Sequence, residues 1–211
     1  MLKRFFAGLF ICTAAIAAVE NSTDDFSVPG YEFQNKVIRY DRNQKNCDSL
    51  PASLEKDFAC AAAAYYKGNF DKSLSAYNKL IGKDSSLDKS ILSRIARSQF
   101  EEKQYAKARK TLSKGDARFP NDAEWKEFAD RIRLDLTLQD PNLKPKSKAD
   151  SIDMFLKNYG DDPSVPRLRY KKGVLLEQAH WYKAAKKAYL YVIAHPSEYG
   201  DQAWEALRRI R

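Results

Sequence analysis

The apolar residues of the chain change their spacing near residue 51. From there onward they recur every three or four positions, which places them on one face of an α-helix. Residues 58–81, FACAAAAYYKGNFDKSLSAYNKLI, contain two such stripes, separated by Lys67-Gly68-Asn69. Gly and Asn are typical of a helix end. This stretch therefore predicts two antiparallel helices joined by a tight turn.

The same arrangement returns along the chain at a nearly constant interval, since Phe70 and Tyr105 lie 35 residues apart. One helix pair cannot bury its own apolar face, so neighbouring pairs must pack on each other. The predicted fold class is all-α, a right-handed superhelical stack of antiparallel helix pairs. We expect the units at about residues 54–83, 87–120, 122–160 and 166–196, with a terminal helix at 199–210.

The order of side-chain sizes within the units resembles a known family, the tetratricopeptide repeat (TPR), whose unit of about 34 residues forms two antiparallel helices. The residues that carry the resemblance are Ile95, Ala96, Gln99, Tyr105, Ala108 and Pro120 in one unit, and Gly173, Leu176, Tyr182, Ala185, Tyr189 and Pro196 in another. The first pair departs from the pattern in a turn one residue shorter and in Ser73, which stands where Ala is usual. The resemblance implies a TPR-like α-solenoid over residues 51–211.

Residues 1–18 have the pattern of a secretory signal peptide. A short basic segment precedes an apolar run that is too short to span a bilayer, and small residues follow it. An N-terminal membrane anchor is the alternative. Residues 19–50 lack helical periodicity but contain several aromatic side chains, so we expect a partly extended arm that lies on the first helices. No transmembrane span is expected after signal cleavage.

Two cysteines remain after the predicted cleavage, Cys47 and Cys60. An even number of cysteines in an exported protein favours a disulfide bond. The alternative is that Cys60 fills a small space among alanines. Both interpretations are compatible with the sequence.

Positive charge exceeds negative charge, with 37 Lys and Arg against 28 Asp and Glu. The excess gathers between residues 166 and 211, which favours an acidic protein, an anionic cell-wall polymer or lipid headgroups as partner. The predicted signal argues against nucleic acid. Stacked helix pairs bind partners through the concave face of their first helices. The candidate partner-binding residues are Arg94, Arg97, Arg131, Arg167, Arg169, Lys171 and Lys172.

The sequence contains no pattern typical of a catalytic, cofactor or metal site. His180 and His195 are the only histidines, and their spacing does not suit a helical metal site. We find no glycine-rich phosphate loop and no paired C-x-x-C. We therefore expect a binding protein that is not an enzyme and has no cofactor.

The resemblance implies a non-catalytic scaffold that binds a protein partner in cell-envelope assembly or maintenance. It is similar to periplasmic TPR scaffolds such as the Tol-Pal-associated coordinator and the TPR-type outer-membrane assembly lipoprotein. The expected location is the periplasm, with association to the outer membrane as a variant. The alternative function is a helical module related to the superhelical part of lytic transglycosylases, which binds or presents peptidoglycan.

Overall fold

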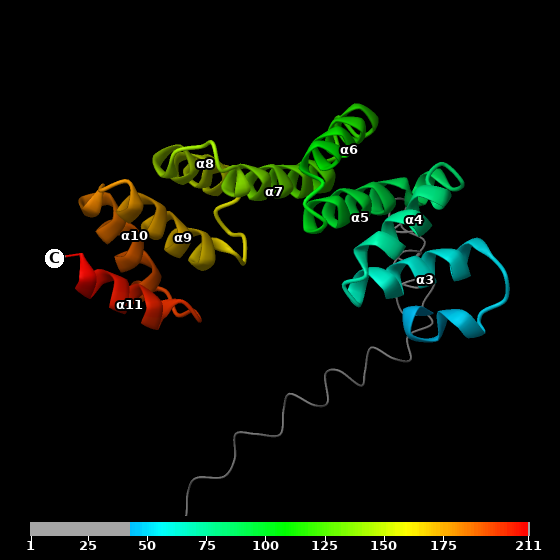
Figure 1. The fold of residues 1–211 in the computed structure, drawn as a ribbon, viewed down its shortest axis with the longest axis horizontal. Helices are drawn as coiled ribbons and strands as arrows, with labels where there is room; N and C mark the ends of the chain where they lie inside the picture. The colour runs from blue at the N-terminus through cyan, green and yellow to red at the C-terminus, as the bar shows by residue number, and fades with distance from the viewer. Residues whose placement is uncertain (1–42, 211) are drawn as a thin grey trace, which may run out of the picture. The chain divides into compact units, whose positions relative to one another are not determined.

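The computed structural model of this 211-residue chain describes residues 43–210 (Figure 1). In this range the chain forms α-helices and two 3-10 helices and contains no strand. The prediction of an all-α chain is confirmed for these residues. The predicted signal peptide, residues 1–18, and residues 19–42 of the predicted arm lie outside the described part.

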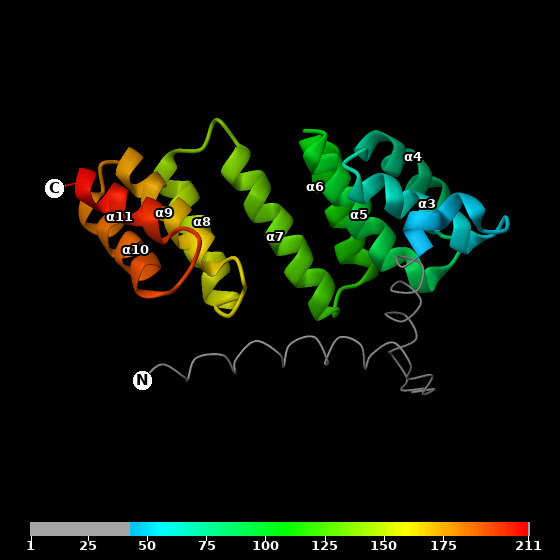
Figure 2. The same ribbon diagram turned by 90° about the horizontal axis from the view of Figure 1, so that it is seen from below.

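The helices follow one another with short connections. Their bounds are α3 (Leu54–Tyr66), α4 (Phe70–Leu80), α5 (Asp88–Glu101), α6 (Tyr105–Arg118), α7 (Ala123–Gln139), α8 (Pro145–Asn158), α9 (Val165–Gln178), α10 (Tyr182–Ala194) and α11 (Gly200–Arg209). Each helix contacts the next one along the chain, and α5 also contacts α7 (Figures 1 and 2). The expected units at 54–83, 87–120, 122–160 and 166–196 each contain two of these helices.

Buried apolar side chains form three clusters, and neighbouring clusters share a helix. Ile91 and Ile95 of α5 pack with α3 and α4, whereas Leu92 and Ala96 of the same helix pack with α6 and α7. In α7, Ile132 and Leu136 belong to the second cluster, whereas Leu134 and Leu138 belong to the third, which extends to α11. A helix with apolar residues on two faces can bury surface against both neighbours.

Three of the turns share one backbone conformation. Gly68, Lys103 and His180 each have a positive φ and each occupy the second position after a helix. The following residue donates its backbone N–H to a carbonyl five positions earlier, as in Gln104 to Gln99. This pattern is a Schellman-type helix end. The expectation that the first turn is one residue shorter is wrong, because the three connections between these helices have the same length.

Two glycines permit close contact between helices. A Cβ at Gly173 of α9 would lie 2.4 Å from the ring of Tyr189 in α10. A Cβ at Gly115 of α6 would lie 1.8 Å from Trp125 at the start of α7. Both aromatic side chains are fully buried, so the missing Cβ atoms make space for the largest groups in the core.

The described end of the predicted arm is helical rather than extended. Asn43–Ser49 form a 3-10 helix, η1, with a kink at Asn46, and the Ser49 hydroxyl donates a hydrogen bond to the Asn46 carbonyl 2.7 Å away. A disulfide bond joins Cys47 of η1 to Cys60 of α3, with Cα atoms 5.2 Å apart. This link fixes the short helix against α3, which a local sequence pattern does not reveal.

Candidate partner-binding surface

The seven cations that the sequence analysis selected lie on α5, α7 and α9. Arg94 of α5 turns toward the core of the first helix pair. Its Nη1 donates to the Tyr77 hydroxyl 2.6 Å away, and its guanidinium lies 5.1 Å from the centre of the Phe58 ring. Cation–π contact and a hydrogen bond to a buried tyrosine indicate a packing role for Arg94.

Arg97, one turn further along α5, pairs with carboxylates on two helices. Its Nη2 lies 2.6 Å from Glu101 on its own helix, and its Nη1 lies 3.2 Å from Asp135 of α7. The side chains of Arg97 and Asp135 are 34% and 20% exposed, so solvent screens this pair only in part. The charge of Arg97 therefore connects the second unit to the third.

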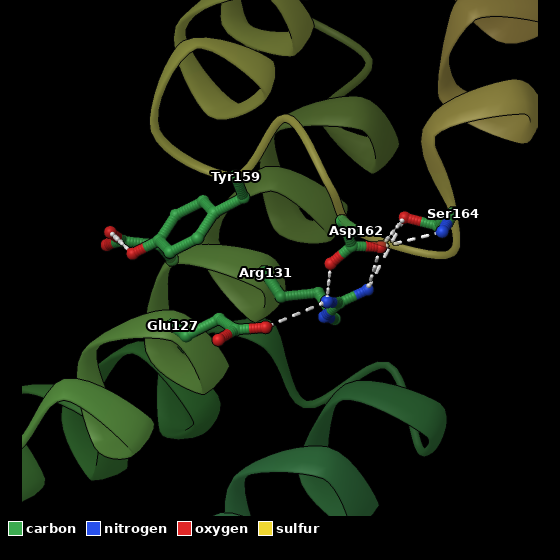
Figure 3. A network of polar contacts seen from close by, with 6 residues as sticks. Glu127, Arg131, Tyr159, Asp162 and Ser164 are labelled. Atoms are coloured by element: carbon green, nitrogen blue, oxygen red, sulfur yellow. Dashed lines mark hydrogen bonds and ion pairs between the residues drawn. The ribbon is translucent and has the colours of Figure 1, made fainter.

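Arg131 of α7 makes the most enclosed of these pairs, drawn in Figure 3. Its guanidinium binds both carboxylate oxygens of Asp162, whose side chain is only 1% exposed, and Nη1 lies 3.1 Å from Oδ1. The carboxylate also accepts hydrogen bonds from the backbone N–H and the hydroxyl of Ser164, at 2.7 and 2.6 Å. Glu127, one turn earlier, is a further partner of Arg131. This network fixes the loop between α8 and α9 to α7.

Beside this network, the Tyr159 hydroxyl donates a hydrogen bond to Asp130 of α7 over 2.8 Å. Burial raises the pKa of Tyr159, and Asp130 raises it further, to about 12. Tyr159 therefore stays neutral and keeps this contact throughout the physiological range. Two polar contacts thus join the end of α8 to the same helix, α7.

Arg169 and Lys172 of α9 share one carboxylate on α8. Lys172 Nζ lies 2.6 Å from Asp153, and Arg169 Nη1 lies 3.7 Å from the same residue. The Arg169 guanidinium also lies 4.9 Å from the centre of the Tyr191 ring in α10. Both cations thus join α9 to its neighbours.

Several ion pairs connect residues 31 to 38 positions apart, close to the 35-residue interval that the sequence predicts. The separations are 38 residues for Arg97 and Asp135, 31 for Arg131 and Asp162, 33 for Lys89 and Asp122, and 32 for Arg209 and Glu177. Burial alone would lower the pKa of Lys89, but Asp122 and Glu124 raise it overall. The recurring separation shows that successive helix pairs are joined by ion pairs as well as by apolar packing.

Arg167 and Lys171 differ from the other five cations. Both are exposed residues of α9, and neither has a hydrogen bond or ion pair with any residue in the described range 43–210. Partial burial lowers the pKa of Lys171, and the charges of Arg167 and Lys148 lower it further, against the opposing effect of Asp135. Positive charge is thus concentrated where α9 approaches α7 and α8.

A cleft of about 670 Å³ opens beside Arg167. The Arg131–Asp162 pair and Ser164 form one side, and Ser197, Glu198 and Tyr199, between α10 and α11, form another. Pro163, Pro166 and Pro196 also line it and restrict the backbone there. The Ser197 hydroxyl oxygen is buried without a hydrogen-bond partner among the described residues. The cleft thus offers the free guanidinium of Arg167 beside backbone that prolines restrict.

The structure therefore separates the seven predicted residues into two groups. Five of the seven have partners within the chain, namely Arg94, Arg97, Arg131, Arg169 and Lys172. The other two, Arg167 and Lys171, have no partner among the described residues. Sequence reasoning missed Asp162, Ser197 and Tyr199, which complete the surface. For Asp162 a signal exists, namely a carboxylate 31 residues from an arginine in a chain whose units repeat at about that interval.

Ligand-type atoms of Cys47, Asp48 and Cys60 lie within 4.8 Å of one another. A metal ion binds cysteine as the thiolate, and the disulfide bond removes that form of both sulfurs.

The described helices include none that is long and apolar enough to cross a membrane.

No model of a known protein family matches the chain, and a comparison with curated proteins also finds no match.

Proposed function

We propose that the chain is a non-catalytic, TPR-like scaffold of the periplasm that binds an acidic protein partner in cell-envelope assembly or maintenance. The observation that carries this proposal is the free guanidinium of Arg167 in the lining of the 670 Å³ cleft, with a second free cation, Lys171, one turn further along α9. An acidic side chain of the partner pairs with Arg167 there.

Three features support the class of protein. Helix pairs contact each other in chain order, and three of their turns share a left-handed residue at the same place, as expected for repeated units. The Cys47–Cys60 disulfide is typical of an oxidising compartment, which agrees with the predicted signal peptide. Both histidines contact tyrosines, His180 the side chain of Tyr182 and His195 the carbonyl of Tyr191, which suits structural roles.

Site-specific photo-cross-linking in the producing cells tests this proposal. We place a photoreactive amino acid at Glu198, at the edge of the cleft, in the full chain. The expected result is one dominant protein adduct, which is lost in the double variant Arg167→Glu/Lys171→Glu. The matched control, Lys157→Glu/Lys186→Glu, changes charge equally at exposed sites on α8 and α10 and should keep the adduct. Absence of any protein adduct, or equal loss in the control, contradicts the proposal.

A second function, peptidoglycan binding, is favoured by one observation on α10. Trp181 and Tyr182 are 54% and 49% exposed, and with Lys183 and Lys187 they line a shallow cleft of about 590 Å³. Exposed aromatic rings suit the apolar faces of sugars, and lysines suit carboxylates. Co-sedimentation with purified cell-wall sacculi tests this function. This function is supported if the parent chain binds sacculi and the variant Trp181→Ala/Tyr182→Ala does not. It is excluded if the parent chain does not bind them.

A further inference from the structure

A row of basic side chains follows one face of α6. Lys107, Lys110, Lys114 and Arg118 are spaced by three or four residues, which places them on neighbouring turns of the same face. Arg118 pairs with the buried carboxylate of Asp88. The three lysines are exposed and have no hydrogen bond or ion pair with any described residue. They are thus free to contact another molecule.

These side chains form the rim of a groove of about 430 Å³ among α4, α5 and α6. In Figures 1 and 2, α5 lies between α4 and α6, and it supplies Leu92 and Ile95 to the groove. Ile81, after α4, adds a third apolar side chain, and Asn78, Gln99 and Thr111 add polar groups. No acidic residue lines the groove, so its charge is entirely positive.

Internal stability does not account for this row. Lysines three or four positions apart on a helix repel each other and weaken the helix slightly. Arg97 of α5 and Arg131 of α7 are instead balanced by carboxylates further along the chain, Asp135 and Asp162. The lysines of α6 have no such carboxylate partner among the described residues.

We propose that this groove binds an acidic amphipathic helix of a protein partner. Its carboxylates, spaced by three or four residues, face Lys107, Lys110 and Lys114, and an apolar side chain covers the partly exposed Ile81. From Lys107 to Arg118 the row extends over about 16 Å, so three turns of a partner helix match it. This inference rests on the proposed function, because it adds a second protein contact to the same scaffold.

Selection from a peptide library tests the inference without knowledge of the natural partner. The probe is a random phage-displayed library of about 16 residues, a length that gives about 24 Å of helix. It is selected against the purified full chain, and enriched peptides are measured by fluorescence anisotropy. We expect enriched sequences with Asp or Glu at helical spacing beside an apolar stripe. The variant Lys107→Gln/Lys110→Gln/Lys114→Gln should bind them about tenfold more weakly, a loss that corresponds to about 1.4 kcal/mol.

The matched control is Lys126→Gln/Lys157→Gln/Lys186→Gln, which removes one exposed lysine each from α7, α8 and α10. It should change the Kd by less than about twofold, and unchanged melting temperatures show that both variants are folded. The inference is overturned if no peptide is enriched or if the enriched peptides are neutral or basic. It is also overturned if both variants weaken peptide binding equally. These outcomes can be distinguished from failure of the proposed function. The cross-link from Glu198, and its loss in Arg167→Glu/Lys171→Glu, test the cleft beside Arg167 and not the groove on α6.

Discussion

Two arginines of the first helices α5 and α7 and three lysines of α6 have opposite surroundings. On α5 and α7, Arg97 and Arg131 are paired with carboxylates from the following unit, whereas the lysines of α6 face solvent without partners. Charge that is enclosed and paired fixes the order of helix pairs, because separating the partners leaves a poorly solvated ion. Charge that is exposed contributes little to folding and is available to attract a partner.

Arg131→Met should give the largest effect on stability. It leaves the buried Asp162 carboxylate without its cation, so we expect a loss of about 2 to 3 kcal/mol in the free energy of unfolding, less than for a fully buried pair because Arg131 is 30% exposed. Urea denaturation followed by circular dichroism measures it. The matched control Lys110→Met on α6 should stay within about 0.5 kcal/mol of the parent. Equal effects of the two substitutions would remove the distinction between the two helices.

Arg97→Met should have an intermediate effect. Both of its carboxylate partners are 20–31% exposed, so solvent screening reduces the contribution, and we expect a loss of about 1 kcal/mol. A double-mutant cycle with Asp135→Asn separates the contact between α5 and α7 from the one within α5. A coupling energy of zero would show that Arg97 does not connect the two units.

Glu177 of α9 should give a smaller, pH-dependent effect through Arg209 of α11. The hydrogen bond from Arg209 lowers the pKa of Glu177; burial opposes this shift, and the Tyr189 hydroxyl supports it. Because the folded-state pKa lies below the unfolded one, the contribution is present above the ordinary value of 4.5 and is lost as the pH falls through the folded pKa. Arg209→Gln should reduce the difference in unfolding free energy between about pH 7 and about pH 3. An unchanged difference would contradict this role of the pair.

The smallest effect on stability is expected for the α6 lysines. Lys107→Gln/Lys110→Gln/Lys114→Gln removes repulsion between like charges and no internal contact, so the free energy of unfolding should be unchanged or about 0.5 kcal/mol higher. A scan of melting temperature against salt should also show a weaker salt dependence than in the parent. A clear loss of stability would mean that these lysines support the fold.

The helix order could be predicted from the sequence because its determinants are local. Lys67-Gly68-Asn69 ends α3, and the apolar spacing around Tyr105 and Ala108 defines the start of α6. In contrast, the candidate surface depends on residues from separate units. The sequence analysis selected Arg131 as a partner-binding residue. It could not detect the pair with Asp162, because the residues next to Arg131 in the sequence are the same whether its side chain is solvated or paired.

The two cysteines show the same limit of local information. Their spacing was compatible with a bond or with simple packing, and only the position of η1 against α3 brings the sulfurs together. The positive charge of the last residues, 166–211, did direct attention to Arg167 and Lys171. Net charge thus indicated a helix that carries free cations, but the distribution of carboxylates on neighbouring helices decided which cations are free.

The most direct measurement compares two double variants in the same samples, recording the urea midpoint and the yield of the Glu198 adduct. Lys89→Gln/Arg97→Gln, which removes two paired cations that do not line the cleft, should lower the midpoint and keep the adduct in urea-free samples, where it is folded. Arg167→Gln/Lys171→Gln should keep the midpoint and lose the adduct. If instead Arg167→Gln/Lys171→Gln destabilises the chain, or leaves the adduct intact, the division between structural and partner-binding cations is contradicted.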